Sequence, residues 1–345
     1  MKKRIKINKT PSSYRDPNGF VFFFQDHVYR QISFTYEKNY ELFINSGLYQ
    51  RLVDKGYLIS HKEVNKFPKE NNVYKIIEPD EIPFITYPYE WCFSELKDAA
   101  LLTLKIQKEA LLSGMTLKDA SSFNIQFLSG KPIFIDTLSF EKYEEGKPWV
   151  AYKQFCEQFL APLTLSAYSD VRLSMLLKVF MEGIPLDLAS NILPLSAKLN
   201  PFVLLHIILH SRSYRNITEN KKINTLNNRS FTKNAFMGLI DSLEEGIGKL
   251  SGKKLKSIWT TYSDKNVSVS YKDKSFEAKK NLVSTYLDSI ISDTLWDIGA
   301  NIGIYSRLAA KKGIFTISID ADSTVIEKSY LQVKQSNENN ILPYF

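Results

Sequence analysis

Two stretches of the sequence combine acidic, amide and glycine residues in spacings that could do chemistry. The first is LKDASSFNIQFLSGKPIFID, in which Asn124 follows Asp119 by five residues and Asp136 closes an apolar hairpin. The second is TLWDIGANIGIYSRLAAKKGIFTISIDAD, which predicts a strand, a glycine-containing turn, a helix and a second strand with an acidic end. Carboxylates and amides supply oxygen atoms that hold cations and orient hydroxyl groups. The structural alternative for the first stretch is that Asp119 and Asn124 cap a turn and Asp136 ends a strand.

The first stretch resembles the catalytic loop of the protein-kinase and small-molecule-kinase superfamily, where D-x-x-x-x-N is followed by a hairpin that ends in a metal-binding Asp. The resemblance implies that Asp119 is the catalytic residue that takes or orients the substrate hydroxyl. It also implies that Asn124 and Asp136 are metal ligands, with Asp136 holding Mg²⁺ against the phosphates of ATP. Mg-ATP is therefore one expected cofactor.

The sequence also departs from that superfamily. Leu117 replaces the His of H-R-D, Thr137-Leu138 replaces the Phe-Gly after the metal-binding Asp, and the N-terminal strands lack a glycine-rich loop. Arg30 stands where the cofactor-binding strand lysine is expected, with Glu37 or Glu41 as its ion-pair partner, and arginine presents a planar fork instead of a point charge. Two alternatives stay open for this part of the chain: an active phosphotransferase, or a kinase-like pseudoenzyme that acts as a binding module.

The second stretch closely resembles motif I and the following acidic motif of class I methyltransferases, which use S-adenosyl-L-methionine. The resemblance implies that Gly299 and Gly303 let the turn approach the methionine end of the cofactor without a Cβ clash. Asp297 would support that turn, and Asp320 would accept hydrogen bonds from both ribose hydroxyls, with Asp322 as the alternative. S-adenosyl-L-methionine is therefore the principal expected cofactor.

Two alternatives compete with this interpretation. A nicotinamide dinucleotide site also uses an acidic residue about 20 positions after its glycines, but here Asn301 stands where such a site has its second glycine. The Asp that precedes the first glycine also favours the methyltransferase. The remaining alternative is a βαβ unit that binds no ligand.

The surrounding sequence predicts the elements that position both stretches. Runs of β-branched and aromatic residues predict two strands between Gly19 and Ser33. Apolar residues at three- and four-residue spacing predict helices at 36–56 and 94–113, the second opened by Ser94 as its N-cap. The same criteria predict strands at 73–77 and 82–88, helices over 147–213, and, towards the C-terminus, helices at 231–250, 274–292 and 322–335 with a strand at Ile341.

The composition is that of an ordinary globular chain, with 345 residues, 44% of them hydrophobic, and a net charge of +8. The two cysteines, Cys92 and Cys156, cannot form a disulfide framework, and no apolar run approaches the roughly 20 residues that span a bilayer. The expected location is therefore cytoplasmic, with no membrane span. Residues 211–257 hold ten Lys or Arg against four Asp or Glu. No nucleic-acid-binding module accompanies this basic segment, so nucleic acid is not an expected partner.

The whole chain resembles a bacterial family of nodulation-related, NoeA-like methyltransferases with an N-terminal kinase-like region. The resemblance implies an α+β kinase-like domain at 1–213, a helical and basic connector at 214–273, and the first half of an α/β Rossmann-like methyltransferase domain at 274–345. Only 25 residues follow Asp320, so the seven-stranded sheet would be incomplete, leaving its first strand with an unpaired apolar edge. We expect a methyltransferase-family protein with an unknown acceptor, inactive unless a partner chain or a missing C-terminal half completes the domain.

Overall fold

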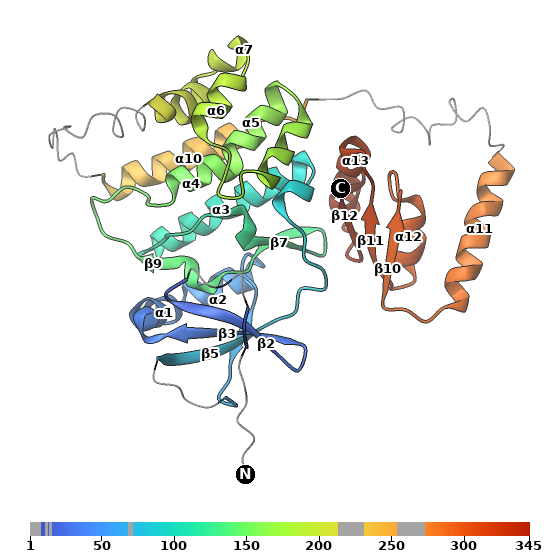
Figure 1. The fold of residues 1–345 in the computed structure, drawn as a ribbon, viewed down its shortest axis with the longest axis horizontal. Helices are drawn as coiled ribbons and strands as arrows, with labels where there is room; N and C mark the ends of the chain where they lie inside the picture. The colour runs from blue at the N-terminus through green and yellow to red at the C-terminus, as the bar shows by residue number, and fades with distance from the viewer. Residues whose placement is uncertain (1–7, 11–12, 14–15, 68–71, 213–230, 254–272) are drawn as a thin grey trace.

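A computed structural model provides the fold and describes residues 8–10, 13, 16–67, 72–212, 231–253 and 273–345. Three parts follow one another: an antiparallel sheet with two helices, a larger helical part, and a parallel sheet with three helices (Figure 1). The boundary predicted at 214–230 and much of the predicted connector lie outside the described residues. The kinase-like and Rossmann-like fold classes stay predictions. In the described ranges, none of the helices has the length and apolar character needed to cross a bilayer.

The N-terminal sheet has five antiparallel strands in the order β1-β2-β3-β5-β4. Two of them are the strands predicted between Gly19 and Ser33. They form a tight hairpin, whose turn residues Gln25 and Asp26 have positive φ angles of 50° and 64°. One face of the sheet gathers the rings of Phe22, Tyr29 and Phe67 into an aromatic core. The strands are β1 (Asn8–Lys9), β2 (Gly19–Phe24), β3 (His27–Ser33), β4 (His61–Glu63) and β5 (Val73–Pro79).

The helix predicted at 36–56 is interrupted in the structure. It consists of α1 (Glu37–Asn45) and α2 (Leu48–Asp54), and Gly47 between them adopts a left-handed φ of 71°. A left-handed residue cannot continue a right-handed helix, and glycine adopts this conformation without a Cβ penalty. The prediction of one continuous helix was therefore wrong at this residue.

The segment before the long helix also differs from its prediction. Residues 82–88, predicted as a strand, pair with no other strand in the described structure and lead into a short 3-10 helix, η3 (Pro88–Glu90). Pro83 and Pro88 remove two amide donors that a strand would need. The N-cap of the following helix is Cys92 instead of the predicted Ser94, because Glu95 accepts a hydrogen bond from the Cys92 amide and fixes the first turn there.

The helical part is organised around α3 (Phe93–Leu112), which is buried along much of its length. After it, β6 (Met115–Leu117) pairs with β9 (Phe140–Lys142), and the predicted hairpin forms from β7 (Ile125–Leu128) and β8 (Lys131–Phe134). Two short 3-10 helices, η4 (Ser122–Asn124) and η5 (Thr137–Ser139), flank this hairpin. The helices after β9 are α4 (Tyr152–Phe155), π-helix η6 (Cys156–Leu160), α5 (Ala161–Tyr168), 3-10 helix η7 (Val171–Lys178), α6 (Leu186–Ile192), α7 (Leu195–Lys198), α8 (Pro201–Val203) and π-helix η8 (Leu204–Leu209).

The helix α10 (Lys233–Lys249), which the sequence placed in the connector, belongs structurally to the helical part. Its apolar stripe needs a partner surface. That stripe shares one hydrophobic core with α3 through Phe236, Ile240, Leu243 and Ile247. The boundary predicted at 213 therefore does not separate α10 from this core, and the domain bounds stay a prediction.

The C-terminal part is a parallel sheet in the order β10-β11-β12. Its first strand lies at one edge, where Trp296 is 55% and Ile298 77% exposed. Within the described ranges, no strand pairs with the free edge of β10. The strands are β10 (Thr294–Ile298), β11 (Phe315–Ile319) and β12 (Ile341–Tyr344), and the helices are α11 (Asp273–Ser289), α12 (Ile304–Lys311) and α13 (Ser323–Ser336).

The C-terminal part is docked on the helical part through α13 and α3. Ile326 and Tyr330 of α13 belong to the same hydrophobic core as α3. The Tyr330 hydroxyl donates a hydrogen bond of 2.7 Å to Asp98, and the Phe345 amide donates one of 3.0 Å to the Glu90 carbonyl. Apolar burial and hydrogen bonds thus join segments that are more than 200 residues apart in the sequence.

Candidate functional sites

A cleft of about 1200 Å³ borders the N-terminal sheet and brings together the residues of the first stretch. Asp119, Asn124 and Asp136 all line it, and so does Arg30 of β3. The hairpin between Asn124 and Asp136 accounts for this convergence, because it returns the chain to its starting point. Their predicted catalytic and metal-binding roles stay predictions. The apolar part of the lining consists of Pro17, Val21, Phe23, Val28, Ile59, Ile77, Pro79, Ile82, Ile85, Ile135 and Leu138.

The Asp136 carboxylate is held by three donors. Its Oδ1 atom accepts from the Leu138 amide at 3.0 Å and lies 2.7 Å from Nη1 of Arg30, while its Oδ2 atom accepts from the Ser139 hydroxyl at 2.6 Å. Asn124 donates through its Nδ2 atom to the same Ser139 hydroxyl at 3.3 Å. Asn124 and Asp136 are thus linked through a serine that the sequence analysis did not identify.

Asp119 is also held by hydrogen bonds. Its Oδ1 atom accepts from the Ser121 amide at 2.9 Å and from Nε2 of Gln154 at 2.8 Å. Both Asp119 and Asp136 therefore cap turns by accepting from an amide two residues later. The structural alternative predicted such a cap for Asp119, but for Asp136 it predicted only the end of a strand. Capping and cleft lining occur together in these two residues.

The ion-pair partner of Arg30 differs from the prediction. Arg30 forms ion pairs with Asp136 at 2.7 Å and with Asp16 at 2.8 Å. Glu41, one of the two predicted partners, instead accepts a hydrogen bond from Tyr74. The reason is tertiary, because Asp16 and Asp136 line the same cleft as Arg30. The sequence analysis missed Asp16, although the Asp-Pro-Asn-Gly run that contains it is a turn signal just before β2.

These contacts bear on the magnesium ion implied by the kinase resemblance. Magnesium needs a near-octahedral set of oxygen ligands. The Asp136 carboxylate already has three donors, and the described residues contain no group of three His, Cys, Asp or Glu side chains that could hold a metal. With Arg30 in this position, the residues of the cleft do not fit a magnesium ion. The guanidinium supplies positive charge to Asp16 and Asp136 instead.

The second stretch forms a turn at the carboxyl end of β10. Gly299, Asn301 and Gly303 all have positive φ angles, of 77°, 53° and 78°. A Cβ at Gly299 would meet no atom within 4 Å, so space is open beside this residue, whereas a Cβ at Gly303 would lie 2.9 Å from Nη1 of Arg307. Gly299 therefore leaves room for a ligand, and Gly303 allows the close packing of α12.

Asp320 fixes this turn from the end of the neighbouring strand. Its Oδ2 atom accepts from the Asn301 amide at 2.8 Å, and its Oδ1 atom accepts from the Asp322 amide at 2.9 Å. Each oxygen keeps a lone pair for a further donor. Asp322, the alternative ribose-binding residue, caps α13 by accepting from the Thr324 amide.

Asp297, predicted to support the turn, contacts helix α12. Its Oδ2 atom accepts from the Ser306 hydroxyl at 2.6 Å, and the Ser306 oxygen in turn accepts from the Ser318 hydroxyl of β11 at 3.0 Å. Asp297 therefore holds α12 against the sheet. The prediction identified the residue as structural but placed its contact in the turn instead of the helix.

One known protein matches nearly the whole length of this chain. No family model matches the chain. The curated protein named "Nodulation protein NoeA", from Rhizobium meliloti (strain 1021), is 30% identical over 346 residues, which cover 98% of this chain and 71% of the relative. With this identity over nearly its whole length, the chain belongs to the family of the nodulation protein NoeA.

Proposed function

We propose that the chain is a methyltransferase-family protein whose C-terminal sheet holds the methionine and ribose portions of S-adenosyl-L-methionine, with a kinase-like domain at its N-terminus. The observation that carries this proposal is the hydrogen bond from the Asn301 amide to Asp320. It places a carboxylate beside the open space at Gly299, at the carboxyl ends of two parallel strands. Ligands of open α/β sheets bind at this edge.

The residues at this edge fit the proposed cofactor. Gly299 would face the methionine end, and the free lone pairs of Asp320 could accept from the ribose hydroxyls. When bound, S-adenosyl-L-methionine supplies an electrophilic methyl group on a sulfonium. The chain's own residues bind and orient it, and the acceptor stays unidentified.

The exposed edge of β10 sets the expected affinity. A small-molecule site normally buries most of its ligand between converging walls. Here no strand of the described ranges covers the outer edge of β10, and the Trp296 and Ile298 side chains of this strand are exposed. We therefore propose weak cofactor binding by this chain alone and no methyl transfer, with tighter binding when a partner chain or a further segment covers β10.

Isothermal titration with S-adenosyl-L-methionine and with NAD tests this proposal. We expect a dissociation constant above roughly 100 μM for S-adenosyl-L-methionine, no binding of NAD, loss of binding in Asp320→Ala, and retained binding in the matched variant Asp322→Asn. Binding that is unchanged by Asp320→Ala would refute the site. Submicromolar binding by the monomer would instead refute the argument from the open edge.

The N-terminal cleft supports a second proposal, a pseudoenzyme that binds a nucleoside-like ligand. Its lining combines an apolar wall with seven acidic side chains against only three basic ones. Such a charge balance repels a triphosphate that carries no metal, and Arg30 already neutralises Asp136. The arrangement therefore favours a ligand without phosphates over the phosphotransferase alternative.

Thermal-shift measurements separate these alternatives. We expect adenosine to raise the melting temperature at least as much as ATP does. The shift caused by ATP should be the same in Mg²⁺ as in EDTA. Asp119→Asn, which removes charge from the cleft, should not abolish adenosine binding. Magnesium-dependent ATP binding with phosphoryl transfer that is lost in Asp119→Asn would establish the phosphotransferase instead.

A further inference from the structure

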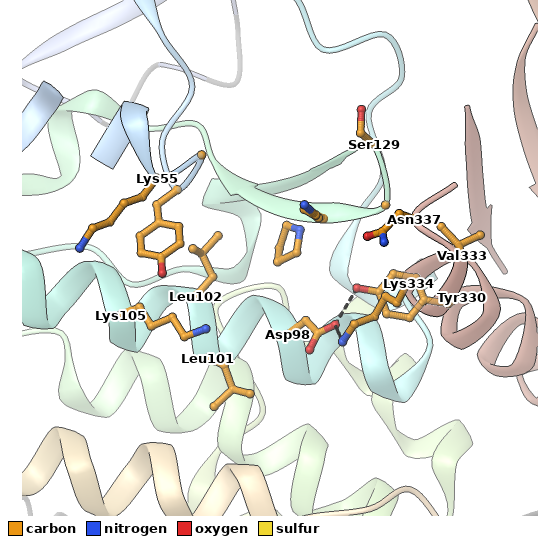
Figure 2. A pocket seen from close by; sticks show the side chains of 15 residues that line it. Lys55, Asp98, Leu101, Leu102, Lys105, Ser129, Tyr330, Val333, Lys334 and Asn337 are labelled. Carbon is orange, nitrogen blue, oxygen red and sulfur yellow. Dashed lines mark hydrogen bonds and ion pairs between the residues drawn. The ribbon is translucent and has the colours of Figure 1, made fainter. Parts of the chain in front are cut away.

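A second cavity lies at the junction between the helical part and the C-terminal sheet. It has a volume of about 280 Å³ and is lined by residues of α3, of the β7–β8 turn, of the segment after α2 and of α13. Figure 2 shows Tyr330, Val333 and Lys334 of α13, and its C-cap Asn337, on one side. Because its walls come from two separate parts of the chain, this cavity exists only when α13 is docked on α3.

The lining of this cavity, which we call the seam cavity, is basic around its opening. It contains four lysines and a single acidic residue, Asp98. Figure 2 shows that Lys105 and Lys334 extend toward Asp98, whereas Lys55 extends away from it. Lys55 lies 2.5 Å from a carboxylate oxygen of Glu109. The seam cavity thus differs in charge from the acidic cleft.

The acidic charge of Asp98 is already compensated. Its Oδ2 atom accepts from the Tyr330 hydroxyl at 2.7 Å and from Nζ of Lys334 at 2.6 Å. Burial, and then the charge of Asp98, raise the pKa of Tyr330 well above its ordinary value, so this hydroxyl stays a donor. Lys105 and Lys131 are exposed and form no ion pair within the part of the chain that the structure describes. The seam cavity therefore carries surplus positive charge.

The interior of the seam cavity is apolar. Leu102 and Val333 are buried there, and Tyr57, Leu101 and Pro132 add further apolar surface to the lining. Removing apolar surface from water lowers the free energy, and the ammonium groups of the lysines attract an anion. The combination fits a small molecule with one anionic group and an apolar body.

We infer that the seam cavity binds a small organic anion, such as an aryl or short acyl phosphate or carboxylate. Lys105 and Lys131 contact its charged group, and the apolar lining contacts its body. Since α3 and α13 both contribute walls, the bound anion strengthens the docking of the C-terminal sheet. This site is distinct from the acidic cleft and from the turn at Asp320.

Titrations with 2-naphthyl phosphate, 2-naphthoate and neutral 2-naphthol test this inference. We expect both anions to bind and to raise the melting temperature, and 2-naphthol to bind about tenfold more weakly or not at all. The two anions distinguish a phosphate from a carboxylate ligand. Affinity should fall as salt is raised, because the lysines are exposed.

Charge-reversal variants provide the matched comparison. Lys105→Glu combined with Lys131→Glu should weaken anion binding at least about tenfold. Lys147→Glu combined with Lys249→Glu makes the same change in net charge at exposed lysines outside the cavity and should leave binding within about twofold. Equal effects of the two double variants, equal binding of 2-naphthol, or no anion binding below about 1 mM would each overturn the inference.

Discussion

The Glu327 carboxylate of α13 accepts two hydrogen bonds from Ser94 in the first turn of α3, 233 residues away in the sequence. One oxygen accepts from the Ser94 amide at 2.9 Å, and the other accepts from the Ser94 hydroxyl. The amides in the first turn of a helix lack partners within the helix, and its dipole favours negative charge there. A residue of the C-terminal part thus completes a helix of the helical part.

This contact predicts that Glu327→Ala lowers the free energy of unfolding by about 1 to 2 kcal/mol, because it leaves the Ser94 amide without its acceptor. Glu327→Gln should lose less, since its amide oxygen still accepts. Urea unfolding measures both effects. The control is Glu277→Ala, which removes an exposed ion pair on α11 and should change the free energy by less than about 0.5 kcal/mol. Equal losses for Glu327→Ala and the control would contradict the prediction.

Gly130 in the β7–β8 turn provides a second test of docking. Its φ is 70°, and a Cβ there would lie 2.7 Å from Cγ1 of Val333, whose side chain is buried on α13. Gly130→Ala should therefore cost about 2 to 4 kcal/mol, combining backbone strain with overpacking. Gly56→Ala has a similar φ of 65° with no atom within 4 Å, and should cost only about 1 to 2 kcal/mol. Equal losses of unfolding free energy for Gly130→Ala and Gly56→Ala in urea would show that the Val333 side chain moves aside without cost.

Arg30 offers a test of charge compensation in the acidic cleft. Arg30→Gln removes the cation that lies between Asp16 and Asp136, so we expect a loss of about 1 to 3 kcal/mol in the free energy of unfolding. The freed carboxylates should then bind Mg²⁺, and a thermal shift with millimolar Mg²⁺ should occur in this variant but not in the wild type. The control Arg51→Gln, at an exposed arginine, should give no Mg²⁺ response. A wild-type protein that responds to Mg²⁺ would show that Arg30 does not block the ion.

His206 predicts a pH dependence of stability. Burial lowers its pKa to about 4, and the neutral ring contacts the Tyr152 and Ser242 hydroxyls at 2.7 and 3.2 Å. In the unfolded chain its pKa is about 6.5, so the unfolded state binds the proton first as the pH falls. The stabilising effect of the neutral ring is therefore complete above about pH 6.5 and declines towards pH 4.

Urea unfolding at pH 7 and pH 4.5 measures this effect. His206→Gln removes the titrating ring, so its loss of stability between the two pH values should be smaller than that of the wild type by about 2 kcal/mol. The control substitution, His27→Gln, changes an exposed histidine of β3. A wild-type pH dependence that His206→Gln leaves unaltered would exclude His206 as its source.

The local sequence was sufficient to predict the elements whose structure depends on residues a few positions apart. The strands between Gly19 and Ser33 and the hairpin around Ser129-Gly130 form as predicted, because turn residues and alternating apolar side chains act over a few positions. The turn at Gly299 and Gly303 is likewise determined locally, since its backbone needs residues that tolerate positive φ. The long helix at 94–113 was predicted within one residue at each end, but its N-cap was not.

The tertiary structure alone decided which distant residues meet. The sequence gives no spacing rule that pairs Arg30 with Asp136, or Glu327 with Ser94, because these contacts depend on how sheets and helices pack across more than 100 residues. The same reason explains why α10 joined the core of α3 and why β10 lies at an exposed edge. Hydrogen-bonding and apolar patterns determine each element locally, whereas burial of the apolar faces that remain determines their partners.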